Sequence, residues 1–176
     1  MTASGGIVQA HLITGDKNSS TSSQRGAYEA RWYTMTPRDD WGMDYFSPVG
    51  SVASPNQPTR GFFYNPNGST ITVDVETASG PGTFNIPSEG VYEYVMPVNS
   101  AAHFSSTSEF YGVVAVGAGP TNGGSSSLDN DTWDWGFSLV PTKNLTPHLI
   151  VGWGPGSSNL SGNGSPVWLA VVNDTT

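Results

Sequence analysis

The chain has 176 residues, enough for one domain with a substantial core, and only 11% of them are charged. Its formal net charge of −8 argues against a nucleic-acid partner, because binding to a phosphate backbone requires a Lys/Arg surface, and equally against an anionic membrane surface. The absence of cysteine excludes thiol catalysis, thiolate metal sites and disulfides, and no apolar run is long enough for membrane insertion.

The spacing of the turn-forming residues favours an all-β fold. Gly, Pro, Asn and Ser interrupt the chain at intervals of roughly 8–12 residues, and no long stretch keeps the apolar period of a helix. This pattern is typical of many short strands. We therefore predict a single domain over residues 1–176, with a flexible tail at residues 1–6. Its fold is an antiparallel β-sandwich, jelly-roll or Ig-like, with about 8–10 strands and negligible helix.

The first predicted strands are residues 7–13 (IVQAHLI) and residues 28–35 (YEARWYTM), the second of which alternates between two faces. Residues 36–50 follow and combine three carboxylates with three aromatic side chains. We interpret this segment as a loop, and it is the most chemically unusual one in the chain.

The next two predicted strands are residues 60–65 and residues 70–77. Between them lies a Pro-Asn-Gly-Ser segment, in which Asn67-Gly68 can supply the positive φ of a tight turn. The sequence therefore predicts that these two strands form a hairpin. Further predicted strands follow at residues 83–86, 91–96 and 109–116.

The most strongly apolar part of the chain lies near its end. From Trp133 to Leu139 every second residue is Trp, Trp, Phe or Leu, which puts four large side chains on one face of a strand. Pro141 then removes a backbone donor and ends this strand. Residues 148–153 and 167–172 are further apolar runs of strand length. We expect these segments to form the core of the sandwich.

Five segments of the chain, taken together, resemble a β-domain of large secreted or cell-surface proteins of bacteria and archaea. That domain is similar to the IgGFc-binding-protein N-terminal-like group. The resemblance covers roughly residues 28–176 and is carried by WYTMTPRDDWGMDYFSPVG, FFYNPNGSTITV, YVMP, DWGFSLVP and VGWGPGSSNLSGNGSPVWLAVVNDTT. It implies an exported, modular β-domain used for adhesion or as part of a surface structure. No catalytic residue is carried over from it.

Two acidic segments are candidate cation sites. Asp129, Asp131 and Asp134 have the spacing of part of a calcium loop, since alternate loop residues can supply several oxygen ligands to Ca²⁺. The complete EF-hand pattern is absent, and the alternative is a solvated acidic turn. The chain therefore predicts Ca²⁺ as its one candidate cofactor.

The second candidate cation site is formed by Asp39, Asp40 and Asp44. The same residues could instead supply a carboxylate pair for glycoside hydrolysis, which requires two acids facing each other across a cleft. The third interpretation is a salt-bridged loop, in which Arg38 or Arg31 pairs with one Asp. The three histidines are too scattered to form a local zinc pair.

The tryptophans have two interpretations. Each large aromatic side chain buries so much apolar surface that packing in the core is a sufficient reason for its presence. An exposed indole, however, is also a platform for sugar stacking, and the candidates for such a ligand-binding role are Trp32, Trp41 and Trp153.

Asn-x-Ser/Thr sequons are frequent, and most of them fall in predicted loops where a glycan would project into water. The alternative is that they only reflect the polar composition of the loops. The predicted glycosylation sites are Asn18, Asn67, Asn130, Asn144, Asn159, Asn163 and Asn173.

The sequence leaves three hypotheses for function. The first is a non-catalytic, secreted or cell-surface module, structural or adhesive, stabilised by Ca²⁺ and able to assemble into a filament when residues 7–13 add to a neighbour's sheet. Its partners would be other surface-protein domains, copies of itself or glycans. The second is a carbohydrate-binding module. The third is a glycoside hydrolase that uses the segment from Asp39 to Asp44.

Overall fold

The computed structural model describes residues 10–14, 31–48, 59–98, 100–115 and 136–148. Within these ranges the strands pair only in antiparallel fashion, and the helical content is two three-residue 3₁₀ turns. The prediction of an all-β antiparallel sandwich with negligible helix is confirmed. In chain order the elements are β1 (His11–Thr14), β2 (Arg31–Thr34), η1 (Arg38–Asp40), β3 (Gly42–Ser47), β4 (Arg60–Tyr64), β5 (Ile71–Thr77), β6 (Gly80–Ile86), β7 (Val91–Val95), β8 (Ala102–Ala115), β9 (Gly136–Ser138) and η3 (Thr142–Asn144).

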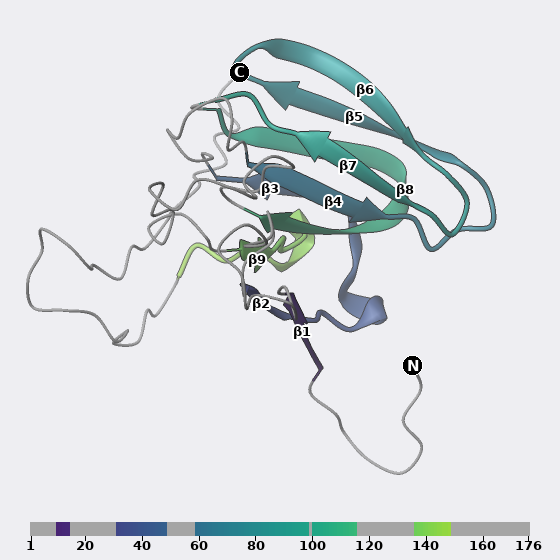
Figure 1. The fold of residues 1–176 in the computed structure, drawn as a ribbon, viewed down its shortest axis with the longest axis vertical. Helices are drawn as coiled ribbons and strands as arrows, with labels where there is room; N and C mark the ends of the chain where they lie inside the picture. The colour runs from purple at the N-terminus through teal and green to yellow at the C-terminus, as the bar shows by residue number, and fades with distance from the viewer. Residues whose placement is uncertain (1–9, 15–30, 49–58, 99, 116–135, 149–176) are drawn as a thin grey trace, which may run out of the picture.

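Strand β8 is the axis of the fold. Its first part, from residue 102 to residue 105, pairs with β5 on one side and with β3 on the other. Its last part, from residue 111 to residue 115, pairs with β4 and β9. Strand β6 extends the first sheet beyond β5, and β7 extends the second beyond β4. Two sheets, β6-β5-β8-β3 and β7-β4-β8-β9, therefore share one long strand (Figure 1).

The core lies between these sheets and combines aromatic with aliphatic side chains. Alternation along β5 buries Ile71, Val73 and Val75, as period two requires of a strand with one face covered. From the opposite sheet, Phe63 is completely buried, and its ring centroid lies 4.6 Å from that of Phe104. A Cβ on Gly112 would lie 2.9 Å from the Phe63 Cδ1 atom, so β8 passes the ring where it lacks a side chain.

The hairpin predicted for residues 60–65 and 70–77 is wrong. Strands β4 and β5 belong to different sheets, and residues 65–70 cross between them. Gly68 is not in the left-handed region; the glycine with positive φ among the described residues is Gly80, the first residue of β6, which pairs with Thr77 at the end of the β5–β6 hairpin. The Asn-Gly step misled because turn composition indicates a change of direction without specifying which strand lies alongside.

Asn65 holds this crossing segment in place. The side chain is fully buried, and its Nδ2 donates to the carbonyl oxygens of Ser69, Ile86 and Pro87 at 2.8, 3.0 and 2.9 Å. Its Oδ1 accepts from the backbone N–H of Asn67 at 2.8 Å. A buried amide whose donors and acceptor are all satisfied therefore replaces a backbone ladder at this crossing.

The predicted loop at residues 36–50 is also partly wrong. Residues 38–40 form η1, but residues 42–47 form strand β3, with alternate side chains directed into the core. Tyr45 packs into the core and Ser47 contacts the core residue Met96, so both are buried on the inner face of β3. The acidic composition concealed the period-two pattern of this segment.

The aromatic row predicted from Trp133 to Leu139 is confirmed where the structure describes it. Leu139 is buried and Phe137 packs against the core, while residues 133–135 lie outside the described ranges. Of the apolar runs 148–153 and 167–172, only residue 148 is described.

Strands β1 and β2 form a separate two-stranded sheet beside β9 (Figure 1). Ser138 Oγ donates to the Thr34 carbonyl oxygen at 2.7 Å and links this sheet to the sandwich. Residues 11–14, part of which the filament hypothesis assigned to a neighbouring subunit, pair with β2 of the same chain. Among all the residues that the structure describes, no helix has the length and apolar character needed to cross a membrane.

Candidate binding site

A hollow of about 170 Å³ lies where the start of β3 meets η3 and the central part of β8. Three separate segments of the chain line it, and they supply apolar, acidic and basic side chains together. The lining residues are Trp41, Gly42, Met43, Asp44, Glu109, Pro141 and Lys143. We call this feature the Trp41 hollow.

An irregularity in strand pairing creates the space. Gly42 pairs with Phe110 and Asp44 with Ser105, so one residue of β3 lies opposite four residues of β8. Strand β8 therefore bulges away at this point and presents Glu109 beside Met43. A Cβ on Gly42 would lie 2.5 Å from the Pro141 Cβ, so only glycine lets the segment before η3 approach β3 this closely.

Tyr45 fixes the bulge from the inside. Its hydroxyl accepts a hydrogen bond from the Gly42 N–H at 2.8 Å and donates one to the Phe110 carbonyl oxygen at 2.6 Å. The side chain is completely buried. Desolvation by this burial raises the pKa of Tyr45 from 10.0 to about 12.

Alkaline pH should therefore destabilise the fold at this point. Between the two pKa values the unfolded chain loses the phenolic proton while the folded chain keeps it. The contribution of Tyr45 to the free energy of unfolding is therefore fully present below pH 10 and decreases as pH rises towards 12. The expected loss in the free energy of unfolding is on the order of 2–3 kcal/mol. Urea unfolding as a function of pH measures it. Tyr45→Phe should flatten the dependence, and an unchanged slope in that variant would contradict the assignment.

Trp41 is held rigidly although it is only half-buried. Its Nε1 donates to the Thr36 carbonyl oxygen at 2.9 Å, and its ring stacks on Tyr111 with centroids 5.0 Å apart and an interplanar angle of 23°. Tyr64 contacts it edge-on at 6.1 Å. These three contacts fix the plane of an indole that borders the hollow.

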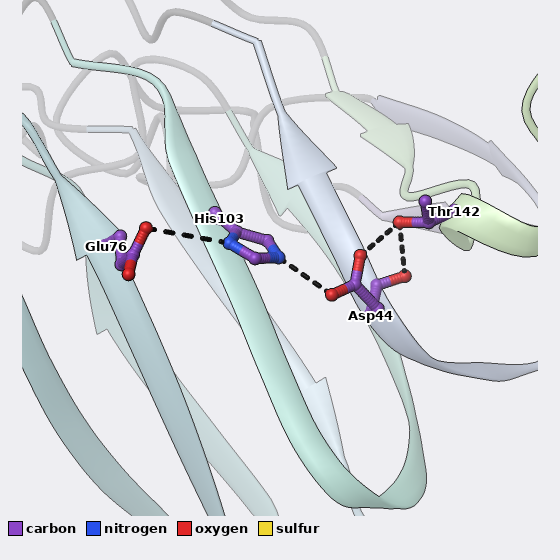
Figure 2. A network of polar contacts seen from close by, with 4 residues as sticks. All are labelled: Asp44, Glu76, His103 and Thr142. Carbon is purple, nitrogen blue, oxygen red and sulfur yellow. Dashed lines mark hydrogen bonds and ion pairs between the residues drawn. The ribbon is translucent and has the colours of Figure 1, made fainter. Parts of the chain in front are cut away.

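A polar network links Asp44, which lines the hollow, to Thr142 on one side and to His103 and Glu76 on the other (Figure 2). His103 Nε2 lies 2.8 Å from Asp44 Oδ2, and His103 Nδ1 lies 3.8 Å from Glu76 Oε2. The imidazole stacks on Phe46 at 4.2 Å with parallel planes. Thr142 Oγ1 hydrogen-bonds to Asp44 Oδ1, so the same carboxylate ties β3 to both β8 and η3.

The two remaining acids of this segment, Asp39 and Asp40, lie exposed in η1. Their backbone carbonyl oxygens accept from Lys143 Nζ at 3.4 Å and from Asn144 Nδ2 at 3.2 Å. The structure does not bring their carboxylates together with that of Asp44. Over the described ranges it contains no group of three or more His, Asp or Glu placed to hold a metal ion.

The other predicted site residues are only partly described. Asn67 uses its Nδ2 to donate to Asn65 Oδ1 and to the Glu109 carbonyl oxygen, whereas Asn144 is exposed. Trp32 lies on β2, and the structure describes only its backbone. Outside the described ranges lie Asp129, Asp131, Asp134, Trp153, Asn18, Asn130, Asn159, Asn163 and Asn173.

Four contributors to the site were missed by sequence reasoning: Met43, Glu109, Thr142 and Lys143. None has a spacing that indicates a ligand, and three of them lie about 65–100 residues from Trp41 in the chain. One signal in the sequence pointed to this region: the strand end predicted at Pro141. In the structure Pro141 forms an isolated β-bridge with Tyr45. That signal located a turn but could not indicate what the turn packs against.

No family model matches the chain, and no curated protein or solved structure matches it either.

The hollow combines two kinds of contact. Trp41, Met43 and Pro141 offer apolar surface, while Asp44, Glu109 and Lys143 offer acceptors and donors. Such a combination suits reversible binding, in which apolar contact gives affinity and a few polar groups orient the ligand.

Proposed function

We propose that this chain is a non-catalytic β-sandwich module of a secreted or cell-surface protein, and that it works in adhesion through the Trp41 hollow. The observation that carries the proposal is the state of Trp41, which remains partly open to solvent although three contacts fix its ring. Aromatic residues held in one orientation are common anchors of binding surfaces, because little conformational entropy is lost when a partner arrives.

Two features of the sequence support an extracellular setting. Few residues are charged, and Ser, Thr, Asn and Gly fill the connections between strands. The resemblance to β-domains of large secreted proteins points to the same setting. Partners in this proposal are other surface-protein domains, further copies of the chain or glycans, and the adhesive contact is made by the side chains around Trp41.

Beads coated with the full chain test the proposal on surfaces of mucin, cellulose, bacterial cell wall and extracellular matrix. We expect adhesion to at least one surface, reduced about tenfold by Trp41→Ala, because removal of a rigid aromatic anchor costs more than 1 kcal/mol of binding. Val140→Ala is the control, since Val140 is exposed beside Pro141 but does not line the hollow. Absence of adhesion on all surfaces, or equal adhesion by Trp41→Ala, would overturn the proposal.

A further inference from the structure

We infer that the ligand of the Trp41 hollow is a neutral sugar, bound as one pyranose ring of a surface glycan. This inference rests on the adhesive function proposed above and names the chemical class of the partner. It follows from the rigidity of the indole, from the balance of charge around it and from the size of the hollow.

The indole provides the platform. The C–H groups on one face of a pyranose ring form an apolar patch that packs flat against an aromatic ring, and this contact requires a ring whose plane is already fixed. Trp41 meets the requirement through its hydrogen bond to Thr36 and its stacking on Tyr111. Met43, with 48% of its surface exposed, and Pro141 extend the apolar surface beside it.

The charges around the indole favour a neutral ligand. The chain as a whole carries a net charge of −8, yet the hollow contains Lys143 together with Glu109 and Asp44. The Asp44 carboxylate is also shared with His103 and Thr142. An anionic ligand would meet two carboxylates, and a cationic ligand would meet Lys143 while both oxygens of Asp44 are already held by His103 and Thr142. Sugar hydroxyls, which both donate and accept, can pair with Glu109 and Lys143 without bringing a charge of their own.

The size of the hollow limits the ligand to one ring. Its volume of about 170 Å³ is below the roughly 300–1,000 Å³ of pockets that enclose a drug-sized ligand, so the hollow suits one small unit. The hollow is formed at the surface by an exposed turn and a strand bulge, so neighbouring rings of a longer glycan can continue into solvent. The inference therefore predicts recognition of one sugar unit within a chain or at its end.

An array of immobilised neutral oligosaccharides built from glucose, galactose, mannose and N-acetylglucosamine tests the inference with the full chain. We expect retention on a subset of these sugars and a loss of about tenfold or more with Trp41→Ala. Glu109→Gln keeps the size of an exposed side chain and should weaken binding several-fold, which guards against loss through misfolding of the Trp41 variant. Val140→Ala should bind as the unaltered chain does.

Salt and surface treatment distinguish the sugar from other partners. Binding should change little between low and high ionic strength, because no ion pair with the ligand forms. On the adhesive surfaces of the bead assay, periodate, which cleaves vicinal diols, should abolish adhesion, and on cellulose, which carries no protein, protease treatment should not. A silent array, equal binding by Trp41→Ala, or strong salt dependence overturns the sugar assignment. Adhesion that depends on Trp41 but is lost only after protease treatment overturns it while sustaining the adhesive function.

Discussion

Phe63→Ala is expected to lower the free energy of unfolding by about 3–5 kcal/mol, the cost of emptying a well-packed aromatic site. Phe63 is completely buried at the centre of the aromatic core, and its ring lies 5.5 Å from that of Phe84 and 4.6 Å from that of Phe104. Both neighbours lie on the sheet opposite to β4, so the cavity cannot close unless the two sheets approach each other.

Urea unfolding followed by tryptophan fluorescence measures this effect, and Phe62→Ala is the matched control. Phe62 lies next to Phe63 on β4 but points to the other face of the sheet, where it is only half-buried. Its replacement should cost less than half as much. Equal losses in the two variants would contradict a core that lies between the two sheets.

Asn65→Ala is expected to destabilise the protein by about 3 kcal/mol, because it leaves buried backbone groups without partners. The substitution removes the donors to the carbonyl oxygens of Ile86 and Pro87 and the acceptor for the Asn67 N–H. The segment that crosses between the sheets would lose the side chain that anchors it.

Thermal or urea unfolding of Asn65→Ala beside Asn85→Ala provides the measurement. Asn85 is exposed on β6, and its side chain accepts a single hydrogen bond from Thr72, so its loss should cost no more than about 0.5 kcal/mol. Equal stability of the two variants would show that water replaces the Asn65 contacts and that the crossing segment does not depend on them.

Strands with a clear alternation, such as β5, were predictable from the sequence because their signal is local, whereas β3 and the first half of β8 were missed. The alternation of Ile71, Val73 and Val75 and the burial of Leu139 follow directly from period two. Which strand lies beside which was not predictable. The partners of β8 on its two sides, β3 with β5 and β4 with β9, come from segments far apart in the chain, and no local pattern encodes that choice.

The candidate site was predictable only in its chemistry. Unusual composition drew attention to Trp41 and Asp44, and both line the hollow. The grouping of Asp39 and Asp40 with Asp44 failed because a strand begins between them, at Gly42, and directs Asp44 towards His103. Lys143 and Glu109 reach the site through the packing of η3 and the bulge in β8, which depend on tertiary structure.

The sharing of β8 by both sheets also bears on how the chain folds during synthesis. Strands β3, β4 and β5 leave the ribosome before the strand that each of them needs as a neighbour. Before β8 has emerged, the β5–β6 and β4–β7 pairs of the sandwich can form but neither sheet can be completed, and the aromatic side chains of the future core stay open to water. A nascent chain stalled in this interval exposes strand edges and apolar surface together, the condition under which chains mispair or require a chaperone.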